Sequence, residues 1–321
     1  MNLNTLKPLG FACLMAFGLA ACGGGDKNAS APASGAAPAT KTESTLEKIK
    51  ASGTIVLGHR DASIPFSYIA DNPNQPIGYA HDLQMKVVEA VKKELNMPDL
   101  KVRYNLVTSQ NRIPLVQNGT VDIECGSTTN NTARQKDAAF AFTTYVEEVR
   151  IATRTNSGIN GIKDLNGKTI VTTTGTTSVQ TLRKNKRADG LTFKEVMGKD
   201  HADSFLMLET GRADAFIMDG SILAANISKS KAPNDYKIVG EVLSVEPIAC
   251  MMRKDDPAFK KAVDESIVRQ IKDGSLTKLY DKWFLQPIPP NNVKVGLPLS
   301  AATKDAWAHP NDKPMEAYEV K

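Results

Sequence analysis

The stretch Lys101–Cys125, KVRYNLVTSQNRIPLVQNGTVDIEC, decides the fold. Polar and apolar side chains alternate through Lys101–Val107, which is typical of a β-strand. Ser109 can cap a helix that ends near Gly119, because serine favours helix starts and glycine favours helix ends. Val121–Cys125 is then a second strand. A strand, a helix and a strand within 25 residues predict parallel strands joined by a crossover helix.

The same order continues on both sides of this stretch. Thr54–Gly58 is an apolar strand, and Asp82–Leu95 has an apolar residue at every fourth position, as an amphipathic helix does. A second series follows, in which Lys168–Thr172 and Ala213–Met218 are strands separated by helical segments. A long helix is expected over Asp256–Lys272. We therefore predict an α/β protein of two lobes, each a mainly parallel sheet flanked by helices.

Two extended segments, Val146–Arg150 and Leu243–Pro247, are expected to link the lobes. The first lobe would then comprise residues 45–147 and 245–321, and the second, inserted lobe residues 148–244. Ligands of open α/β sheets bind beyond the carboxyl ends of the strands. Two lobes facing each other across such ends predict a hinged cleft.

The N-terminal segment predicts export. Lys7 precedes an apolar run, Leu9–Ala21, that is too short to span a bilayer. Leu19–Cys22 reads Leu-Ala-Ala-Cys and resembles a bacterial lipoprotein signal, with residues 1–21 removed and lipid attached to Cys22. Residues 22–44, rich in Gly, Ala, Ser, Pro and Thr, would form a flexible linker. The alternative is an ordinary secretory signal with a chance cysteine.

These features predict a periplasmic protein anchored by lipid. Gly23 follows Cys22, so there is no aspartate to retain the lipoprotein at the inner membrane. The sequence therefore leaves open which membrane holds the anchor, and surface exposure stays possible.

The cysteine content of the folded part is consistent with export. Cys125 and Cys250 remain once Cys13 and Cys22 are set aside, and an even pair in an oxidising compartment predicts a disulfide. Two buried free thiols are the alternative. The sequence contains no Cys-x-x-Cys motif and no Cys/His cluster, so it does not indicate a metal site.

Charge and composition exclude several classes of function. The formal net charge is +5, basic residues are scattered and aromatic residues make up 6% of the chain, so no nucleic-acid partner is indicated. There is no G-x-S-x-G motif and no phosphate-binding loop. We expect no cofactor and no enzymatic activity.

Polar residues that follow predicted strands are the candidate binding residues. They are Arg60, Ser109, Arg112, Ser127, Thr129, Arg134, Thr177, His201 and Asp219. A guanidinium group matches a carboxylate in bidentate fashion, a helix start favours an anion, and a carboxylate can pair with an ammonium group. Several have a plainer interpretation: Arg60 in a surface salt bridge, Ser109 as a helix cap beside a solvated Arg112, Arg134 exposed on a cap-rich loop, and His201 as a cap or surface residue.

Several strings resemble the polar amino acid family of ABC-transporter solute-binding proteins, and within it members that bind glutamate and aspartate. They are Gly58-His59-Arg60, Ser109–Gly119 (SQNRIPLVQNG), Glu124–Asn131 (ECGSTTNN), Lys199-Asp200-His201 and Phe216–Asp219. The resemblance covers about Ser44 to Pro290. It implies the two-lobed type II periplasmic-binding-protein fold. The differences are the lipoprotein signal with its long linker, and Thr174 where a serine is expected.

The resemblance also implies a role for each candidate residue. Arg134, helped by Thr129 and the amide of Thr177, would bind an α-carboxylate. Ser127, Thr129 and Asp219 would receive the ammonium group. The side-chain carboxylate would lie among Arg60, Ser109, Arg112 and His201.

The implied ligand is L-glutamate or L-aspartate, and the implied partner is an ABC-transporter permease, served by a monomer. A buried arginine is costly without an anion, so amides should bind more weakly than acids. Two alternatives stay open: a surface lipoprotein with a sensory or protein-interaction role, and a small-molecule enzyme.

Overall fold

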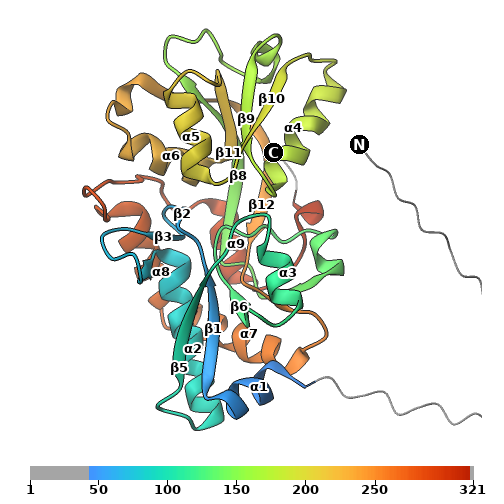
Figure 1. The fold of residues 1–321 in the computed structure, drawn as a ribbon, viewed down its shortest axis with the longest axis vertical. Coiled ribbons are helices and arrows are strands. Elements are labelled where there is room, and N and C mark those ends of the chain that lie inside the picture. Colours follow the sequence, from blue (N-terminus) through green and yellow to red (C-terminus); the bar gives the residue numbers. More distant parts are fainter. Residues whose placement is uncertain (1–42, 319–321) are drawn as a thin grey trace, which may run out of the picture. The chain divides into compact units, whose positions relative to one another are not determined.

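The computed structural model describes residues 43–318. The expected signal peptide, Cys22 and all but the end of the expected linker lie outside the described residues. Two five-stranded sheets dominate, in the orders β5-β1-β6-β13-β7 and β10-β9-β11-β8-β12. We call the first sheet with its helices the first lobe and the second sheet with its helices the second lobe (Figure 1). No helix in residues 43–318 has the length and apolar character needed to cross a membrane.

The first lobe contains most of the elements near the two ends of the described chain. Its sheet is built from β1 (Thr54–His59), β5 (Lys101–Leu106), β6 (Ile123–Glu124), β7 (Ala138–Phe140) and β13 (Met251–Arg253). Its helices are α1 (Thr45–Ser52), α2 (Tyr79–Leu95), α3 (Arg112–Gln117), α7 (Pro257–Lys272), α8 (Ser275–Tyr280) and the π-helix η4 (Asp281–Leu285). β1 pairs in parallel with β5 and β6, and β13 is antiparallel to β6 and β7.

Both faces of this sheet are covered, as predicted. Neighbouring residues of β13 point to opposite faces: Met252 packs into the core that includes Leu83 and Val87 of α2. Met251 packs with Val116 of α3 on the other face. Helices on both faces bury both sets of strand side chains, which stabilises the sheet.

The second lobe has the same plan. Its strands are β8 (Tyr145–Arg154), β9 (Thr169–Thr173), β10 (Lys194–Gly198), β11 (Ala215–Asp219) and β12 (Tyr236–Ile248). Its helices are α4 (Thr177–Ala188), α5 (His201–Glu209) and α6 (Gly220–Lys229), with 3-10 turns η2 (Ile162–Leu165) and η3 (Pro233–Asp235). β9, β10 and β11 are parallel, whereas β8 pairs antiparallel with β11 and β12. Each sheet is therefore mixed, with a parallel part of three strands.

Two long antiparallel strands, β8 and β12, connect the lobes (Figure 1). At the first-lobe end of the pair, the amide of Thr144 donates to the carbonyl of Ile248 at 2.9 Å. Glu147 and Glu246 lie directly opposite each other in this ladder. We call β8 and β12 the hinge strands.

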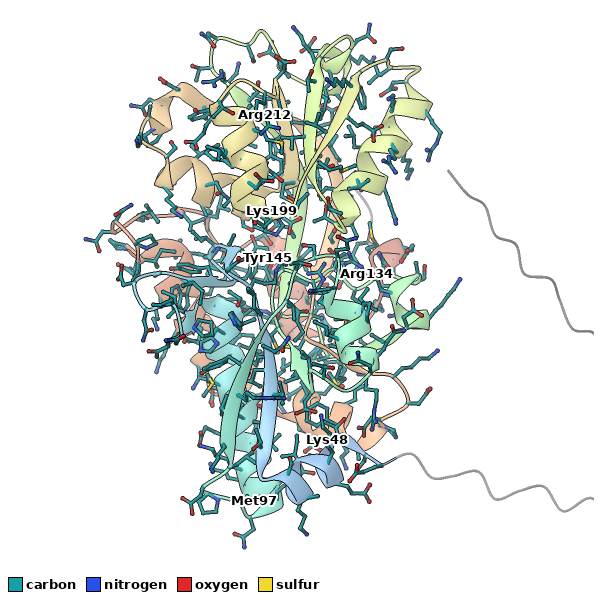
Figure 2. The ribbon with its side chains drawn as sticks, in the orientation of Figure 1. Lys48, Met97, Arg134, Tyr145, Lys199 and Arg212 are labelled. Atoms are coloured by element: carbon teal, nitrogen blue, oxygen red, sulfur yellow. A yellow bond between two sulfur atoms is a disulfide. The ribbon has the colours of Figure 1, made fainter. Side chains whose placement is uncertain are left out.

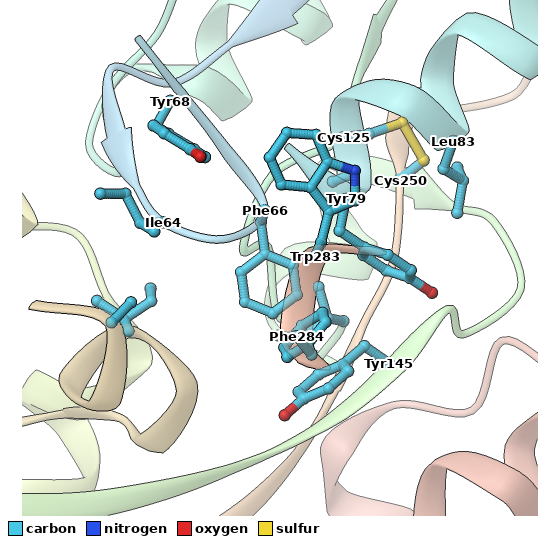
Figure 3. Close-up of a cluster of buried hydrophobic side chains, with 14 of the residues drawn as sticks. Ile64, Phe66, Tyr68, Tyr79, Leu83, Cys125, Tyr145, Cys250, Trp283 and Phe284 are labelled. Carbon is cyan, nitrogen blue, oxygen red and sulfur yellow. A yellow bond between two sulfur atoms is a disulfide. The ribbon is translucent and has the colours of Figure 1, made fainter. Parts of the chain in front are cut away.

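An aromatic cluster holds the start of β8 in the first lobe (Figure 3). Tyr145 stacks on Phe284, with ring centroids 5.2 Å apart, and Phe66 meets Tyr145 edge-on at the same separation. The hydroxyl of Tyr79 donates to the carbonyl of Thr144 at 2.8 Å. Aromatic pairs of this kind add packing energy beyond area burial, so they fix where the hinge strand leaves the lobe.

The predicted disulfide is confirmed. Cys125 follows β6, Cys250 precedes β13, and the two are bonded across this antiparallel pair (Figure 3). The whole second-lobe sheet lies between the two cysteines in sequence.

Two features of the first lobe were not predicted from the sequence. A small sheet, β2 (Ala62–Ser63), β3 (Ser67–Ile69) and β4 (Pro76–Ile77), precedes α2. The C-terminal segment contains the helix α9 (Ala301–Ala308) and the turn η5 (Met315–Ala317). The hydroxyl of Thr303 accepts from the amide of Val146 at 3.0 Å, so α9 is docked on a hinge strand.

Candidate functional site

All nine candidate residues lie where strands of the two lobes end, and each is at most 9% exposed. Arg60 follows β1, Asp219 ends β11, and Thr177 and His201 are the first residues of α4 and α5. Arg134 opens the short 3-10 helix η1 (Arg134–Lys136), and it lies between the lobes in Figure 2. The plainer interpretations, which needed exposed side chains, are therefore wrong for Arg60, Arg112 and Arg134. The cap interpretation is wrong for His201, because Asp200 is the N-cap of α5.

Ser109 has a different role from the expected helix cap. Helix α3 begins at Arg112, with Asn111 in the N-cap position and no side-chain cap. The hydroxyl of Ser109 instead accepts a 3.0 Å hydrogen bond from Nη2 of Arg60. The cap prediction fails because a buried guanidinium group needs this acceptor.

Arg60, Arg112 and His201 form a basic group that spans both lobes. Burial, reinforced by the neighbouring Arg112, lowers the pKa of Arg60 to about 10, and burial also lowers the pKa of Arg112. Burial, followed by the charges of Arg60 and Arg112, lowers the pKa of His201 well below its ordinary value. The two guanidinium groups therefore stay charged at neutral pH while the imidazole is neutral.

Several nitrogens of this basic group lack a protein partner. Nε and Nη1 of Arg60, Nε of Arg112 and Nε2 of His201 are buried and have no hydrogen-bond partner among residues 43–318. A buried unpaired donor costs about 1–3 kcal/mol, and more when it is charged. A group of unpaired buried nitrogens in one place therefore destabilises the fold unless an anion binds there.

Asp219 is the acidic counterpart of this group. Both of its carboxylate oxygens are buried and have no hydrogen-bond partner in the described part of the chain. Burial, together with Glu147 and Glu246, raises the pKa of Asp219 well above its ordinary value, while Arg112 and Arg134 act in the opposite direction. A cation placed beside this carboxylate would favour its charged form.

Arg134 joins the lobes at the site. Its Nη1 donates to the carbonyl of Thr129 at 2.8 Å in the first lobe, and its Nη2 donates to the carbonyl of Gly175 at 3.1 Å in the second. Burial, with a contribution from Arg112, lowers the pKa of Arg134 to about 9. Gly175 itself lies against the backbone of Gln110, because a Cβ there would be 2.7 Å from Gln110 N and Cα.

The remaining candidates complete the wall of the site. The carbonyl of Ser127 accepts from Nη1 of Arg112 at 3.4 Å. The hydroxyl oxygens of Thr129 and Thr177 lie 3.4 Å apart across the two lobes. The structure thus brings all nine candidate residues into one connected region.

Two buried carboxylates of the site were missed by the sequence reasoning. Nη1 of Arg112 donates to Thr128 Oγ1 at 2.7 Å, and that hydroxyl donates to Glu124 Oε2 at 2.6 Å. Glu246 accepts from the hydroxyls of Thr129 and Thr177. Both carboxylates are fully buried. For Glu124 the sequence signal was an acidic residue between the apolar Ile123 and Cys125, whereas the neighbours of Glu246 gave no comparable signal.

Glu124 and Glu246 also offset the positive charge of the three arginines of the site. Three arginines and Asp219 alone would leave an excess of positive charge over a monoanionic ligand. Both carboxylates act on Arg112 and Arg134 as neighbouring negative charges. Of the three arginines of the site, Arg112 is linked to a protein carboxylate, that of Glu124, through the hydroxyl of Thr128.

Comparison with known proteins defines the class of this chain. Residues 55–286 match the family model of bacterial extracellular solute-binding proteins, family 3, and the protein belongs to that family. It is 53% identical over 272 residues to an L-glutamate/L-aspartate-binding protein of Pseudomonas aeruginosa, covering 85% of this chain and 90% of the relative. It is 48% identical over 285 residues to a glutamate/aspartate import solute-binding protein of Escherichia coli, covering 89% and 93%.

The solved structures agree on the fold. A mutant of ArgBP from T. maritima superposes with a TM-score of 0.65 at 26% identity, over 74% of this chain and 98% of that one. The architecture is that of type II periplasmic amino-acid-binding proteins, as the family resemblance implied.

Proposed function

We propose that this protein captures L-glutamate or L-aspartate between its lobes and delivers it to the permease of an ABC transporter. One observation carries the proposal: unpaired nitrogens of Arg60, Arg112 and His201 and the unpaired carboxylate of Asp219 are buried in one region. An acidic amino acid has the complementary groups, a side-chain carboxylate and an ammonium group. The glutamate/aspartate import solute-binding proteins at 48% identity support this choice over a purely sensory role.

The proposed roles follow the chemistry of each group. Arg60, Arg112, Ser109 and His201 would surround the side-chain carboxylate, because three of them have free nitrogens. Arg134 would bind the α-carboxylate, with help from Thr129 and the amide of Thr177. The ammonium group would be received by Asp219, Ser127 and Thr129.

Selectivity for acids over amides would follow from charge rather than size. A glutamine ligand would leave a buried guanidinium group without its anion. Loss of one hydrogen bond to a charged group weakens binding by about 1.5–3 kcal/mol, or about ten- to hundredfold in Kd. Glutamate and aspartate differ by one methylene group, which is worth about 1–3 kcal/mol.

We further propose how the protein is deployed. A monomer, tethered through lipid on Cys22, would exchange between open and closed arrangements in which residues 148–244 move relative to residues 45–147 and 245–321. The hinge strands β8 and β12 would bend during this exchange. The protein would bind its ligand without chemical conversion.

The proposal is tested by titration calorimetry with four ligands: L-glutamate, L-aspartate, L-glutamine and L-asparagine. We expect both acids to bind and both amides to bind at least tenfold more weakly. Arg60→Met should remove this preference, whereas Arg103→Met, the same change on the exposed side of β5, should keep it. Equal affinity for acids and amides, or no binding of either acid, would contradict the proposal.

A further inference from the structure

Glu246 is a buried carboxylate on a hinge strand, with no exposed surface. Its Oε2 accepts a 2.6 Å hydrogen bond from the hydroxyl of Thr129, which belongs to the first lobe. The same oxygen accepts a 2.6 Å bond from the hydroxyl of Thr177, the first residue of α4 in the second lobe. Its Oε1 accepts from Ser244 at 2.7 Å. One carboxylate on the hinge is thus bonded to both lobes.

The direction of these bonds fixes the orientation of the two threonine hydroxyls. Glu246 is the acceptor in both bonds, so the single hydrogen of each threonine hydroxyl points toward Glu246. Arg112 and Arg134 lie close enough to Glu246 for its carboxylate to act on both guanidinium groups as a neighbouring negative charge. The hydroxyl oxygens of Thr129 and Thr177 therefore face the site as acceptors, which suits an ammonium group and not a carboxylate.

The same bonds depend on how the lobes are placed. A hydrogen bond to a charged group weakens steeply when its partners move apart. Because Oε2 lies 2.6 Å from a hydroxyl in each lobe, separation of the lobes must break at least one of the two bonds. The hydroxyl oxygens of Thr129 and Thr177 are therefore both held as acceptors for the ammonium group only while the lobes are together.

We propose that Glu246 is a positioning residue of the site, which accepts one hydroxyl hydrogen bond from each lobe. These bonds hold the lobes together and leave the hydroxyl oxygens of Thr129 and Thr177 as acceptors for the ligand's ammonium group. This inference rests on the proposed amino-acid ligand. It assigns the hydroxyl of Thr177, in addition to its amide, to ligand recognition. It also implies that Thr129 meets the α-carboxylate through its backbone.

The test compares L-glutamate with glutarate, the dicarboxylate that lacks the ammonium group, in titration calorimetry. Glu246→Leu removes the acceptor, and we expect it to weaken L-glutamate binding about ten- to hundredfold more than glutarate binding. Glu246→Gln keeps a carbonyl oxygen that can occupy the Oε2 position, so it should restore most of the preference for L-glutamate. Glu241→Leu, the same change at an exposed position of β12, is the matched control.

An unchanged ratio of L-glutamate to glutarate affinity in a folded Glu246→Leu protein would overturn the inference. If that variant does not fold, Thr177→Val removes the second-lobe hydroxyl alone, and Thr177→Ser restores it. An unchanged ratio in folded Thr177→Val would likewise overturn it. Failure of the proposed function differs from both results, because the unmodified protein would then bind neither acidic amino acid.

Discussion

Replacing Gly175 by alanine places a methyl group in the contact between the lobes. The backbone at Gly175 has φ +80°, and an added Cβ would lie 2.7 Å from Gln110 N and Cα and from the carbonyl carbon of Ser109. These are backbone atoms of the other lobe, so no flexible side chain can move aside. The two backbones must separate by about 0.7 Å to restore an ordinary contact of 3.4 Å.

This separation would act on the bonds that cross the lobes. Nη2 of Arg134 donates to the carbonyl of Gly175 itself at 3.1 Å. Lengthening this donor–acceptor distance by about 0.7 Å would take it beyond hydrogen-bond range. A lost bond to a charged group is worth about 1.5–3 kcal/mol, so we expect L-glutamate to bind about ten- to hundredfold more weakly. The positive φ adds about 1 kcal/mol of strain to the folded state.

Gly167→Ala provides the matched control for this prediction. Gly167 has φ +74° and no atom within 4 Å of an added Cβ, so it carries the strain without the contact. Calorimetric unfolding without ligand should show similar losses of stability in both variants. Titration with L-glutamate should separate them. Equal affinity in Gly175→Ala and Gly167→Ala would refute the reasoning.

Three further predictions concern stability. Burial raises the pKa of Glu147 to about 7 from an ordinary value of 4.5, so the folded state binds a proton that the unfolded chain releases. The free energy of unfolding should therefore fall as pH rises between about 4.5 and 7, and this group contributes at most about 1.4 kcal/mol per pH unit. Urea denaturation across this pH range should show a smaller decrease in the free energy of unfolding for Glu147→Gln. Replacing Cys125 and Cys250 together by serine should lower the free energy of unfolding by about 5 kcal/mol, because the disulfide closes a loop with a sequence separation of 125; urea denaturation under non-reducing conditions measures the difference, and an unchanged midpoint would contradict it. Thr303→Val should cost about 1–3 kcal/mol in calorimetric unfolding, since the buried amide of Val146 loses its acceptor, whereas Thr210→Val at an exposed helix end should cost less.

Much of the fold could be predicted because it depends on local patterns. The apolar repeat of Asp82–Leu95 predicted most of α2, and the helix begins one turn earlier, at Tyr79. Gly78 sets that start: its φ is +132°, and a Cβ there would lie 2.3 Å from the carbonyl oxygen of Phe66. This close approach involves a residue twelve positions away, which no local repeat encodes.

The features that were missed depend on contacts between distant residues. Glu246 meets Thr129 across 117 positions and Thr177 across 69. Its burial and its hydrogen bonds follow from the packing of the hinge strands, so its sequence neighbours give little sign of its position. The small sheet β2-β3-β4 was missed because strands of two or three residues are too short to show alternation.

The Cys125–Cys250 bond has a consequence for a chain that has been cut. Every strand of the second lobe lies between these two cysteines in sequence. If one peptide bond in that interval is hydrolysed, each fragment retains one of the two cysteines. The nicked molecule stays one covalent species, and after a cut between β8 and β12 each hinge strand remains joined to the first lobe by its own fragment.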